Sequence, residues 1–397
     1  MLHLANRLNR FNESQTIGMA KLGRELAAKG HDVINLSFGE PDFQTPQHIK
    51  DAAKAAIDEG FTFYTPVSGY IELRQAISDK FLRENSLNYS TDQIVVSVGA
   101  KHSIMNVVLC TVNPGDEVII PNPYWVSYGA MVRLAEGTPI HIHTAVENDF
   151  KITPEQLEAA ITPRTSLFIF SSPCNPTGSL YSKEELSALA EVFARYPHIY
   201  IISDEIYEHI NFVGKHESIA QFESIAERVI TVNGVSKGYA MTGWRIGYIG
   251  ASKIVAQSCE KMQGQFTSGA CSIAQRASIA ALNSNMQPTW DMRDAYLRRR
   301  NLVLEMMKDI PGLKTNVPGG AFYLFPDVRA FFGKTDGSHH IKNSEDLCMY
   351  LLNTAYVSLV SGDAFGDENC LRFSYAAADE KLIEAVDRIK TALAKLH

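Results

Sequence analysis

The chain has 397 residues, of which 45% are hydrophobic and 20% charged, and its formal net charge is −7. This length exceeds one simple core and fits a globular protein of two or more domains. This net negative charge excludes the strongly basic composition that is typical of proteins that bind nucleic acid or an acidic membrane. No apolar run approaches the roughly 20 residues needed to span a bilayer.

The middle of the chain alternates short β-rich runs with helical patterns. Helices are predicted at residues 101–111 and 184–196, the second opening after Ser182 with glutamates in its first turn. Strands are predicted at residues 93–98, 117–120, 140–143, 166–170, 199–203, 229–232 and 245–249. This alternation predicts an α/β fold whose mainly parallel sheet is covered on both faces.

The C-terminal third differs in pattern. Residues 290–308 read as one long helix that connects two domains, and a final helix is predicted at residues 380–396. Short strands are expected at residues 321–325, 357–360 and 371–375. These elements predict a smaller α+β domain beside the large α/β domain. The polar loop at residues 333–343 is the most linker-like stretch.

The six cysteines form no C-x-x-C pair and no His/Cys metal spacing, which predicts reduced thiols in a cytoplasmic protein without a metal. The first residues lack the apolar run and small-residue cleavage site of a signal peptide. We therefore expect a cytoplasmic location, with neither nucleic acid nor a membrane as partner.

The segment at residues 236–248 carries the strongest functional signal. Lys237 lies in a turn of small residues, and Arg245 follows eight residues later among glycines. A lysine amine that loses its proton is a nucleophile for imine formation, and the arginine fork matches a phosphate. The simpler alternative is a surface lysine that precedes a strand.

Other polar residues follow predicted strands, whose carboxyl ends form the usual ligand crevice of an open α/β sheet. Asp204 directly follows the strand at residues 199–203, although an isolated aspartate there is more often a helix N-cap. Asn175 lies in the turn Ser-Pro-Cys-Asn-Pro-Thr-Gly after the strand at residues 166–170. Gly99-Ala100-Lys101 opens a helix after the first strand, where an anion is favoured.

In this order the motifs resemble those of pyridoxal-phosphate (PLP) aminotransferases of fold type I, class I, and most closely enzymes similar to bacterial aspartate aminotransferase. The resemblance spans roughly residues 30–390. It implies a large PLP-binding domain at residues 46–290 with a mainly parallel seven-stranded sheet. The small domain would comprise residues 1–45 and 291–397.

The resemblance implies a role for each cofactor-side residue. Lys237 would carry the imine and shuttle the proton, and Asp204 would keep the pyridine nitrogen protonated. Asn175 and Tyr207 would reach the phenolic oxygen, and Trp125 would stack on the ring. The phosphate would lie against Ala100, Lys101, Ser236, Arg245 and, from a second subunit, Tyr64. A shared site of this kind implies a homodimer.

Substrates would be an L-amino acid and a 2-oxo acid that react in turn. Arg372 lies inside the apolar run Leu-Arg-Phe-Ser and would bind the substrate α-carboxylate, although an edge-strand arginine that faces water is the alternative. The resemblance adds four further residues to the substrate side: Gly39, Trp125, Asn175 and Phe322.

The chain departs from the family at two points. Gly234 stands where a phosphate-binding serine is frequent, three residues before the lysine. No cation can be assigned to the second carboxylate of a dicarboxylic substrate; the polar candidates are Arg10, Asn12, Ser14, Gln15, Thr16 and Lys101. Aspartate with 2-oxoglutarate is the expected pair, with activity on aromatic or other neutral amino acids beside it.

Three alternatives compete with this interpretation. A PLP-dependent β-elimination lyase would share every cofactor residue and differ only in the substrates that it turns over. A regulator with a degenerate fold would lack the lysine, which is present. A nicotinamide-binding protein would need G-x-G-x-x-G after the first strand, and Val-Gly-Ala-Lys-His-Ser does not supply it.

Overall fold

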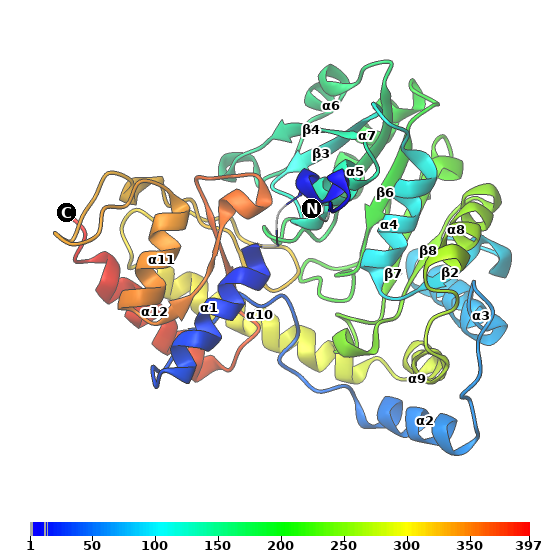
Figure 1. Ribbon diagram of the computed structural model, residues 1–397, viewed down its shortest axis with the longest axis horizontal. Helices are drawn as coiled ribbons and strands as arrows, with labels where there is room; N and C mark the ends of the chain where they lie inside the picture. Colours follow the sequence, from blue (N-terminus) through cyan, green and yellow to red (C-terminus); the bar gives the residue numbers. More distant parts are fainter. Residues whose placement is uncertain (1–2, 12, 14) are drawn as a thin grey trace.

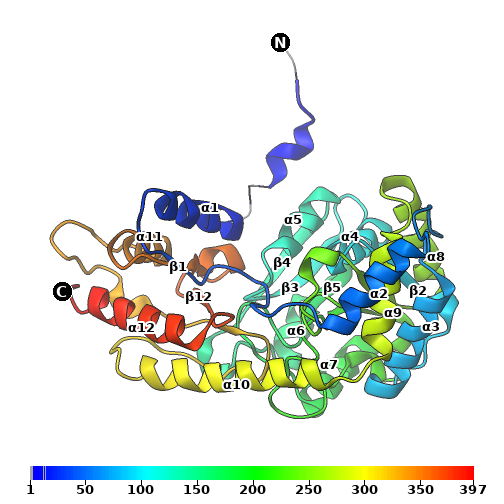
Figure 2. The same ribbon diagram turned by 90° about the horizontal axis from the view of Figure 1, so that it is seen from below.

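The computed structural model describes residues 3–11, 13 and 15–397, and its elements form two groups joined by the long helix α10, Gln287–Met307. In Figure 1 the strands of the main sheet lie on one side, and α1 (Gln15–Ala28), α11 (Ser344–Thr354) and α12 (Asp379–Leu393) lie on the other. Helix α10 runs beneath both groups in Figure 2. It starts at Gln287 rather than at residue 290, because Pro288 is tolerated in a first helical turn.

Among the described residues, the largest sheet has seven strands in the order β2-β8-β7-β6-β5-β3-β4. Strand β8 pairs antiparallel with both of its neighbours, and every other pairing in the sheet is parallel. This result confirms the mainly parallel sheet predicted from the sequence. The strands are β2 (Ile94–Ser97), β3 (Glu117–Asn122), β4 (Thr138–His143), β5 (Thr165–Ser171), β6 (Tyr200–Asp204), β7 (Val229–Gly234) and β8 (Gly247–Gly250).

Helices cover both faces of this sheet because successive strand residues point to opposite sides. In β5, for example, Phe168 and Phe170 join one core cluster, whereas Leu167 and Ile169 join the other. The first cluster includes residues of α2 (Gln47–Asp58), α3 (Ile71–Lys80), α6 (Pro154–Ala160), α7 (Lys183–Ala194) and α9 (Ser272–Asn283). The second includes residues of α4 (Ala100–Thr111), α5 (Ser127–Leu134) and α8 (Lys253–Phe266).

The second group of elements has its own core. Strand β12 (Leu371–Ser374) pairs antiparallel with β11 (Val360–Ser361) and with β9 (Tyr323–Leu324). Strand β1 (Ile34–Asn35) pairs in parallel with β10 (Val357–Ser358), so an N-terminal segment packs against the C-terminal part as expected. The domain boundaries at residues 46 and 291 stay a prediction.

Three local differences from the sequence prediction have physical causes. The strand expected at residues 357–360 is two short strands, β10 and β11, which pair with different partners. The strand expected at residues 245–249 starts only at Gly247, because Arg245 follows a single 3₁₀ turn and has a left-handed φ of 58°. The loop at residues 333–343 is not a linker, since it lies between two elements of one group and buries Ile341.

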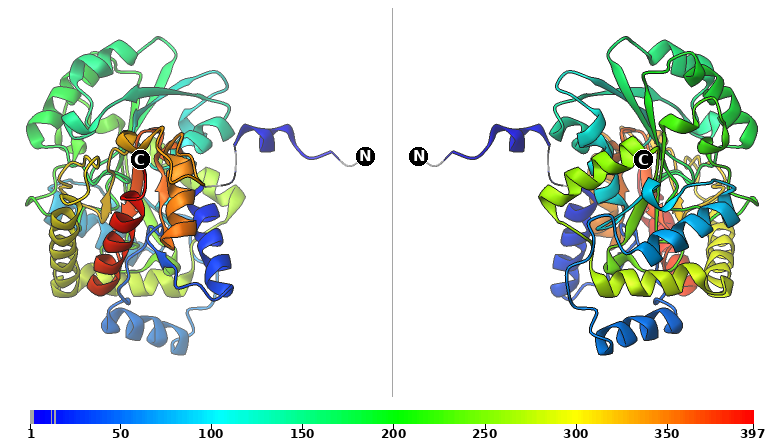
Figure 3. Two further views of the ribbon diagram at one scale, coloured as in Figure 1. Left: turned by 90° about the vertical axis from the view of Figure 1, so that its left-hand side faces the viewer. Right: turned by 90° about the vertical axis from the view of Figure 1, so that its right-hand side faces the viewer.

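The short 3₁₀ helix at Asn6–Arg10 projects away from the rest of the chain (Figures 2 and 3). At its base Arg10 pairs with Glu136 at 3.1 Å. All six cysteines are free thiols. Across residues 3–11, 13 and 15–397, no helix has both the length and the apolar character required to cross a membrane.

Candidate active site

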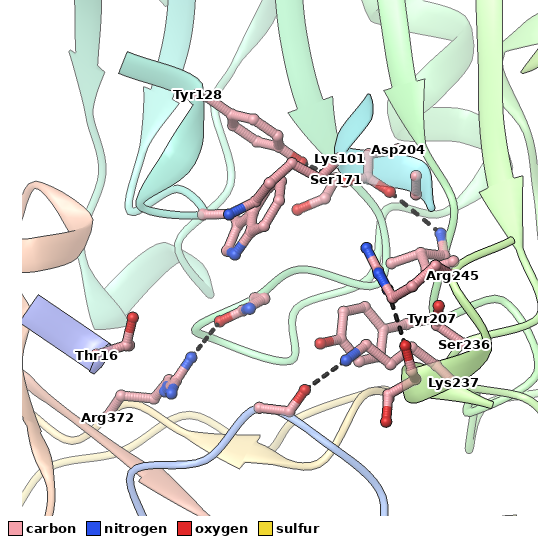
Figure 4. Close-up of a pocket in the computed structure, with 16 residues that line it drawn as sticks. Thr16, Lys101, Tyr128, Ser171, Asp204, Tyr207, Ser236, Lys237, Arg245 and Arg372 are labelled. Carbon is pink, nitrogen blue, oxygen red and sulfur yellow. Dashed lines mark hydrogen bonds between the residues drawn. The ribbon is translucent and has the colours of Figure 1, made fainter. Parts of the chain in front are cut away.

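One cavity opens at the carboxyl ends of the central strands, where the sequence places its polar residues. Ser171 at the end of β5 and Asp204 at the end of β6 are neighbours in register, and Gly234 ends β7 beside them. The cavity (Figure 4) is lined by Thr16, Gly39, Ala100, Lys101, Trp125, Tyr128, Ser171, Asn175, Asp204, Ile206, Tyr207, Ser236, Lys237, Thr242, Arg245 and Arg372. Parallel topology therefore brings together the ends of β5, β6 and β7, while Thr16, Gly39 and Arg372 join the cavity from the second group of elements.

Lys237 reaches into this cavity from the loop that follows β7 (Figure 4). Its Nζ donates a hydrogen bond to the carbonyl oxygen of Gly39. Burial lowers the pKa of Lys237 to about 8; the neighbouring Arg372 lowers it too, while Glu40 opposes the shift. Because an amine with this pKa is partly neutral near physiological pH, Lys237 can act as a nucleophile toward a carbonyl carbon.

Asp204 presents a buried carboxylate to the same cavity. Its Oδ2 accepts a hydrogen bond of 2.6 Å from Tyr128, and its Oδ1 accepts one of 3.3 Å from the backbone N–H of Ile206. Burial raises the pKa of Asp204 to about 6, and these two hydrogen bonds oppose the rise. A cationic partner in the cavity would stabilise the ionised form.

Tyr128 was missed by the sequence analysis. It lies in the first turn of α5, three residues after Trp125, and its ring contacts that of Trp125 edge-on at 5.5 Å between centroids. Its place in the same short segment as Trp125 is the signal that could have found it. Tyr128 is buried, and its hydroxyl fixes the direction of the Asp204 carboxylate.

A cradle for an anion lies between the N-terminus of α4 and Arg245. Gly99 has φ of 82°, and a Cβ at this position would lie 2.2 Å from Nη2 of Arg245, so the guanidinium lies directly over the glycine. The first N–H groups of a helix have no partner within the helix and favour a negative charge. The arginine and the backbone amides of Ala100 and Lys101 therefore form a cationic site that can bind an anion.

The glycine at position 234 has a steric cause. A Cβ there would lie 2.8 Å from the carbonyl oxygen of Ile246 and 3.0 Å from Cα of Gly247. The backbone that enters β8 thus fills the space that a serine side chain would need. Ser236 is buried and lines the cavity, where it offers a hydroxyl beside the cradle.

Arg372 lies in β12 and is only 2% exposed, which excludes an edge-strand arginine facing water. Its Nη1 donates to Oδ1 of Asn175 at 3.1 Å, and its Nη2 donates to the carbonyl oxygen of Ser37 at 2.6 Å. Its Nε is buried without a hydrogen-bond partner, and among the described residues no carboxylate forms an ion pair with it. Such a buried cation is completed by an anionic ligand.

The aromatic wall differs from the sequence prediction. Phe322 is fully buried and does not line the cavity, because its ring packs behind Tyr207, at 5.5 Å between centroids, and Tyr323, at 4.7 Å. Tyr207 does line the cavity, and its hydroxyl is 2.7 Å from that of Tyr323. Phe322 therefore supports the wall from behind rather than forming its surface.

The described candidates for binding a second substrate carboxylate separate into two sets. Thr16 and Lys101 line the cavity, and the Lys101 ammonium lies 4.9 Å from the ring centre of Trp125. Arg10 and Gln15 bond elsewhere, to Glu136 and Asp363 respectively. Asn12 and Ser14 lie outside the described residues.

Tyr64 does not reach the cavity of its own chain. It is 97% exposed, and its neighbour Phe63 is 82% exposed. Two large aromatic side chains in contact with water are typical of a surface that meets another protein.

The fold and the residues of this cavity are those of an aminotransferase, and comparison with known proteins supports this assignment. The chain belongs to the family Aminotransferase class I and II, whose model matches residues 31–389. A relative named aspartate/prephenate aminotransferase from Cereibacter sphaeroides is 49% identical, with 100% of both chains covered.

Solved structures agree as well. The aspartate aminotransferase of Rhizobium meliloti superposes with a TM-score of 0.97 at 42% identity and covers 100% of both chains. The aspartate aminotransferase of Thermus thermophilus with maleate gives a TM-score of 0.93 at 38% identity, covering 99% of this chain and 100% of that one. The chain is thus an aminotransferase, as the sequence predicted.

We expect Asp204→Asn to stabilise the cofactor-free protein at pH 7.5. A carboxylate with a folded pKa of about 6 against an unfolded 3.8 binds more protons when folded, so stability falls as pH rises between these values. Removing that titration should add about 3 kcal/mol to the free energy of unfolding in urea at pH 7.5, and about half of that at pH 5. Equal stability of variant and wild type at both pH values would contradict this interpretation.

Proposed function

We propose that the cavity binds PLP and that the enzyme moves an amino group between an L-amino acid and a 2-oxo acid as a cytoplasmic homodimer. One observation carries the proposal: a lysine of lowered pKa, a buried carboxylate and a buried arginine without an anionic partner line one cavity. Family membership supports the aminotransfer reaction.

The residues present fit the proposed cofactor. When bound, PLP supplies an electron sink for the carbanion at the substrate α-carbon. The Asp204 carboxylate would hold the pyridine nitrogen protonated, which is the cationic partner that its burial calls for. The cradle would hold the phosphate with Ala100, Lys101, Ser236 and Arg245. Trp125 would cover one face of the ring, and Asn175 and Tyr207 would reach its phenolic oxygen.

Lys237 would have two tasks. It would bind the cofactor covalently through its amine, and once released by the incoming amino acid it would carry a proton away from the α-carbon. Both tasks need an amine that loses its proton near neutral pH, and the pKa of about 8 for Lys237 supports this role.

Arg372 would bind the substrate α-carboxylate. Its planar fork is held by Asn175 and by the carbonyl oxygen of Ser37, so it pays little ordering entropy on binding. Gly39 lies beside it, since a Cβ built at this glycine would be 3.8 Å from Nη1 of Arg372. A side chain there would narrow the entrance for the carboxylate.

For the substrate side chain we infer aspartate with 2-oxoglutarate as the best pair. The names of the relatives support a dicarboxylic substrate, and Lys101 beside Trp125 offers a cation within the cavity. Trp125 also supports activity on aromatic or other neutral amino acids. Prephenate is a second candidate acceptor, because the relative from Cereibacter sphaeroides carries it in its name.

Among the predictions that follow from the proposed function, the first concerns the covalent lysine. Borohydride reduction of the PLP-loaded enzyme, followed by peptide mapping, should place the label on Lys237 alone. Lys237→Ala should take up no reducible label and lose turnover, whereas Lys101→Ala, a second lysine of the cavity, should keep the label. A label on another lysine in the wild type would reject the assignment.

The second prediction concerns Arg372. Arg372→Met should lower kcat/KM for aspartate by about 10²- to 10³-fold, because a bound carboxylate loses roughly 3–4 kcal/mol when its buried partner is removed. Arg300→Met, which changes a partly buried arginine outside the cavity, is the matched control and should stay near wild type.

A substrate panel with the same enzyme tests specificity. A kcat/KM for aspartate far below that for a neutral amino acid would reject aspartate while leaving the aminotransferase proposal intact. Release of pyruvate or ammonia would instead favour β-elimination.

The third prediction concerns the homodimer. The variants Tyr64→Phe and Lys237→Ala should each be impaired, and a mixture that exchanges subunits should regain about a quarter of the wild-type sites. This follows because a hybrid dimer restores one complete site when Tyr64 acts across the interface. The double variant mixed with Lys237→Ala is the control and should show no recovery. Full activity of a monomer in sedimentation would contradict the shared site.

A further inference from the structure

Next to the end of β6, which carries Asp204, several charged side chains are buried that do not line the cavity. Asp204 and Tyr207 point into the cavity (Figure 4). The next residue after each of them is a buried glutamate. Glu205 is 0% exposed and Glu208 is 5% exposed, and neither lines the cavity. Burying a carboxylate is unfavourable unless it is paired and hydrogen-bonded, and these two do not face the cavity, so their burial must have another role.

Glu208 is held by a closed set of bonds from α3 and the short helix that follows it. The fully buried ammonium of Lys80 donates to Oε1 of Glu208, and Nδ2 of Asn85 donates to its Oε2 at 2.8 Å. Oδ1 of Asn85 in turn accepts from Lys80 at 2.8 Å. The ion pair therefore has the additional hydrogen bonds that a buried pair needs.

The next residue, His209, connects this set to the lysine loop. Its Nε2 lies 2.8 Å from Oε2 of Glu84, which is 3.8 Å from the Lys80 ammonium. A Cβ at Gly238 would lie 2.5 Å from Nδ1 of His209, so the imidazole packs directly on the residue after Lys237. We call Lys80, Glu84, Asn85, Glu208 and His209 the rear cluster.

Glu205 is anchored next to Glu208, since atoms of both carboxylates and of the His216 imidazole lie within 4.8 Å of one another. It accepts hydrogen bonds from Ser203 at 2.8 Å and from Ser218 at 2.5 Å, and it lies 3.0 Å from Nε2 of His216. Glu205 and Glu208 follow the cavity-facing residues Asp204 and Tyr207 in the chain. Their bonds therefore hold the turn that starts at Asp204 in place.

We propose that the rear cluster is a positioning device, which fixes the turn bearing Asp204 and Tyr207 and the loop bearing Lys237 relative to one another. The proposal rests on the proposed function of these three residues. The two segments come from different strands, β6 and β7, and their ends are loops. Reacting groups misplaced by about 1 Å can lose 10²-fold in rate, so a rigid link between the loops has a catalytic consequence.

If the rear cluster only stabilised the fold, changing it would lower stability without a specific effect on the site. A comparison variant elsewhere in the sheet distinguishes this role from a positioning role. Glu117 is also a carboxylate of low exposure, 4% exposed and bonded to Arg164 and Thr162. Its partner Arg164 is 73% exposed, and Glu117 starts β3, at the opposite end of the strands from the cavity. Glu208→Gln and Glu117→Gln make the same chemical change at the two places. Both should lower the free energy of unfolding in urea.

The experiment compares these variants first without cofactor, by amide hydrogen exchange. For Glu208→Gln we expect exchange at residues 204–209 and 236–240 to rise at least 10-fold more than in β5. With cofactor we expect PLP to bind about 10-fold more weakly and kcat to fall about 10-fold, while KM for the amino acid changes less than 3-fold. Glu117→Gln should show none of these site-specific effects.

The proposal is overturned if the two variants behave alike, or if Glu208→Gln leaves exchange and kcat unchanged. Glu84→Leu removes the partner of His209 at a partly exposed position, and it decides the question with the same readouts if Glu208→Gln does not fold. Because amide exchange is measured without cofactor, its result does not depend on which lysine borohydride labels in the PLP-loaded enzyme. A label on a lysine other than Lys237 would reject the proposed function and leave the link between the loops intact.

Discussion

The structure depends on the burial of charge around one cavity, which lies at the carboxyl ends of the central strands of the main sheet. Asp204, Lys237 and Arg372 lie around a single cavity, and burial disfavours the charged form of each, so their pKa values all move toward neutrality of the group. Three such groups destabilise an empty protein. A ligand with a cationic ring nitrogen would offset the cost of burying Asp204, and its reactive carbonyl would bind Lys237. The carboxylate of a substrate would offset the cost of burying Arg372. Buried groups of this kind are typical of a binding site rather than of a feature that stabilises the fold.

The fold supplies the geometry for this burial. Parallel strands bring their carboxyl ends to one edge, so Ser171, Asp204 and the start of the Lys237 loop meet there without being close in sequence. Antiparallel β8 enters from the same edge, which places Arg245 against Gly99 at the N-terminus of α4. The second group of elements closes the cavity with Arg372 from β12 and Gly39 from the N-terminal segment.

The sequence predicted the parts that depend on local signals. Strand and helix alternation predicted the sheet. The spacing of Lys237 and Arg245, the position of Asp204 after a strand and the family resemblance predicted residues that the cavity brings together. Contacts between distant segments could not be read in this way. The bond from Tyr128 to Asp204, the retreat of Phe322 behind Tyr207, and the left-handed backbone of Arg245 follow from tertiary packing, which no local pattern records.

The central claim is that this cavity performs aminotransfer in two separate halves, and a single-turnover measurement tests it most directly. The PLP-loaded enzyme is mixed with an amino acid alone while the cofactor absorbance is followed. The account predicts that one equivalent of 2-oxo acid forms per active site as the carbonyl form of the cofactor disappears, and that adding a 2-oxo acid restores it. A cofactor spectrum that no amino acid changes, or ammonia released without conversion of the cofactor, would contradict the account.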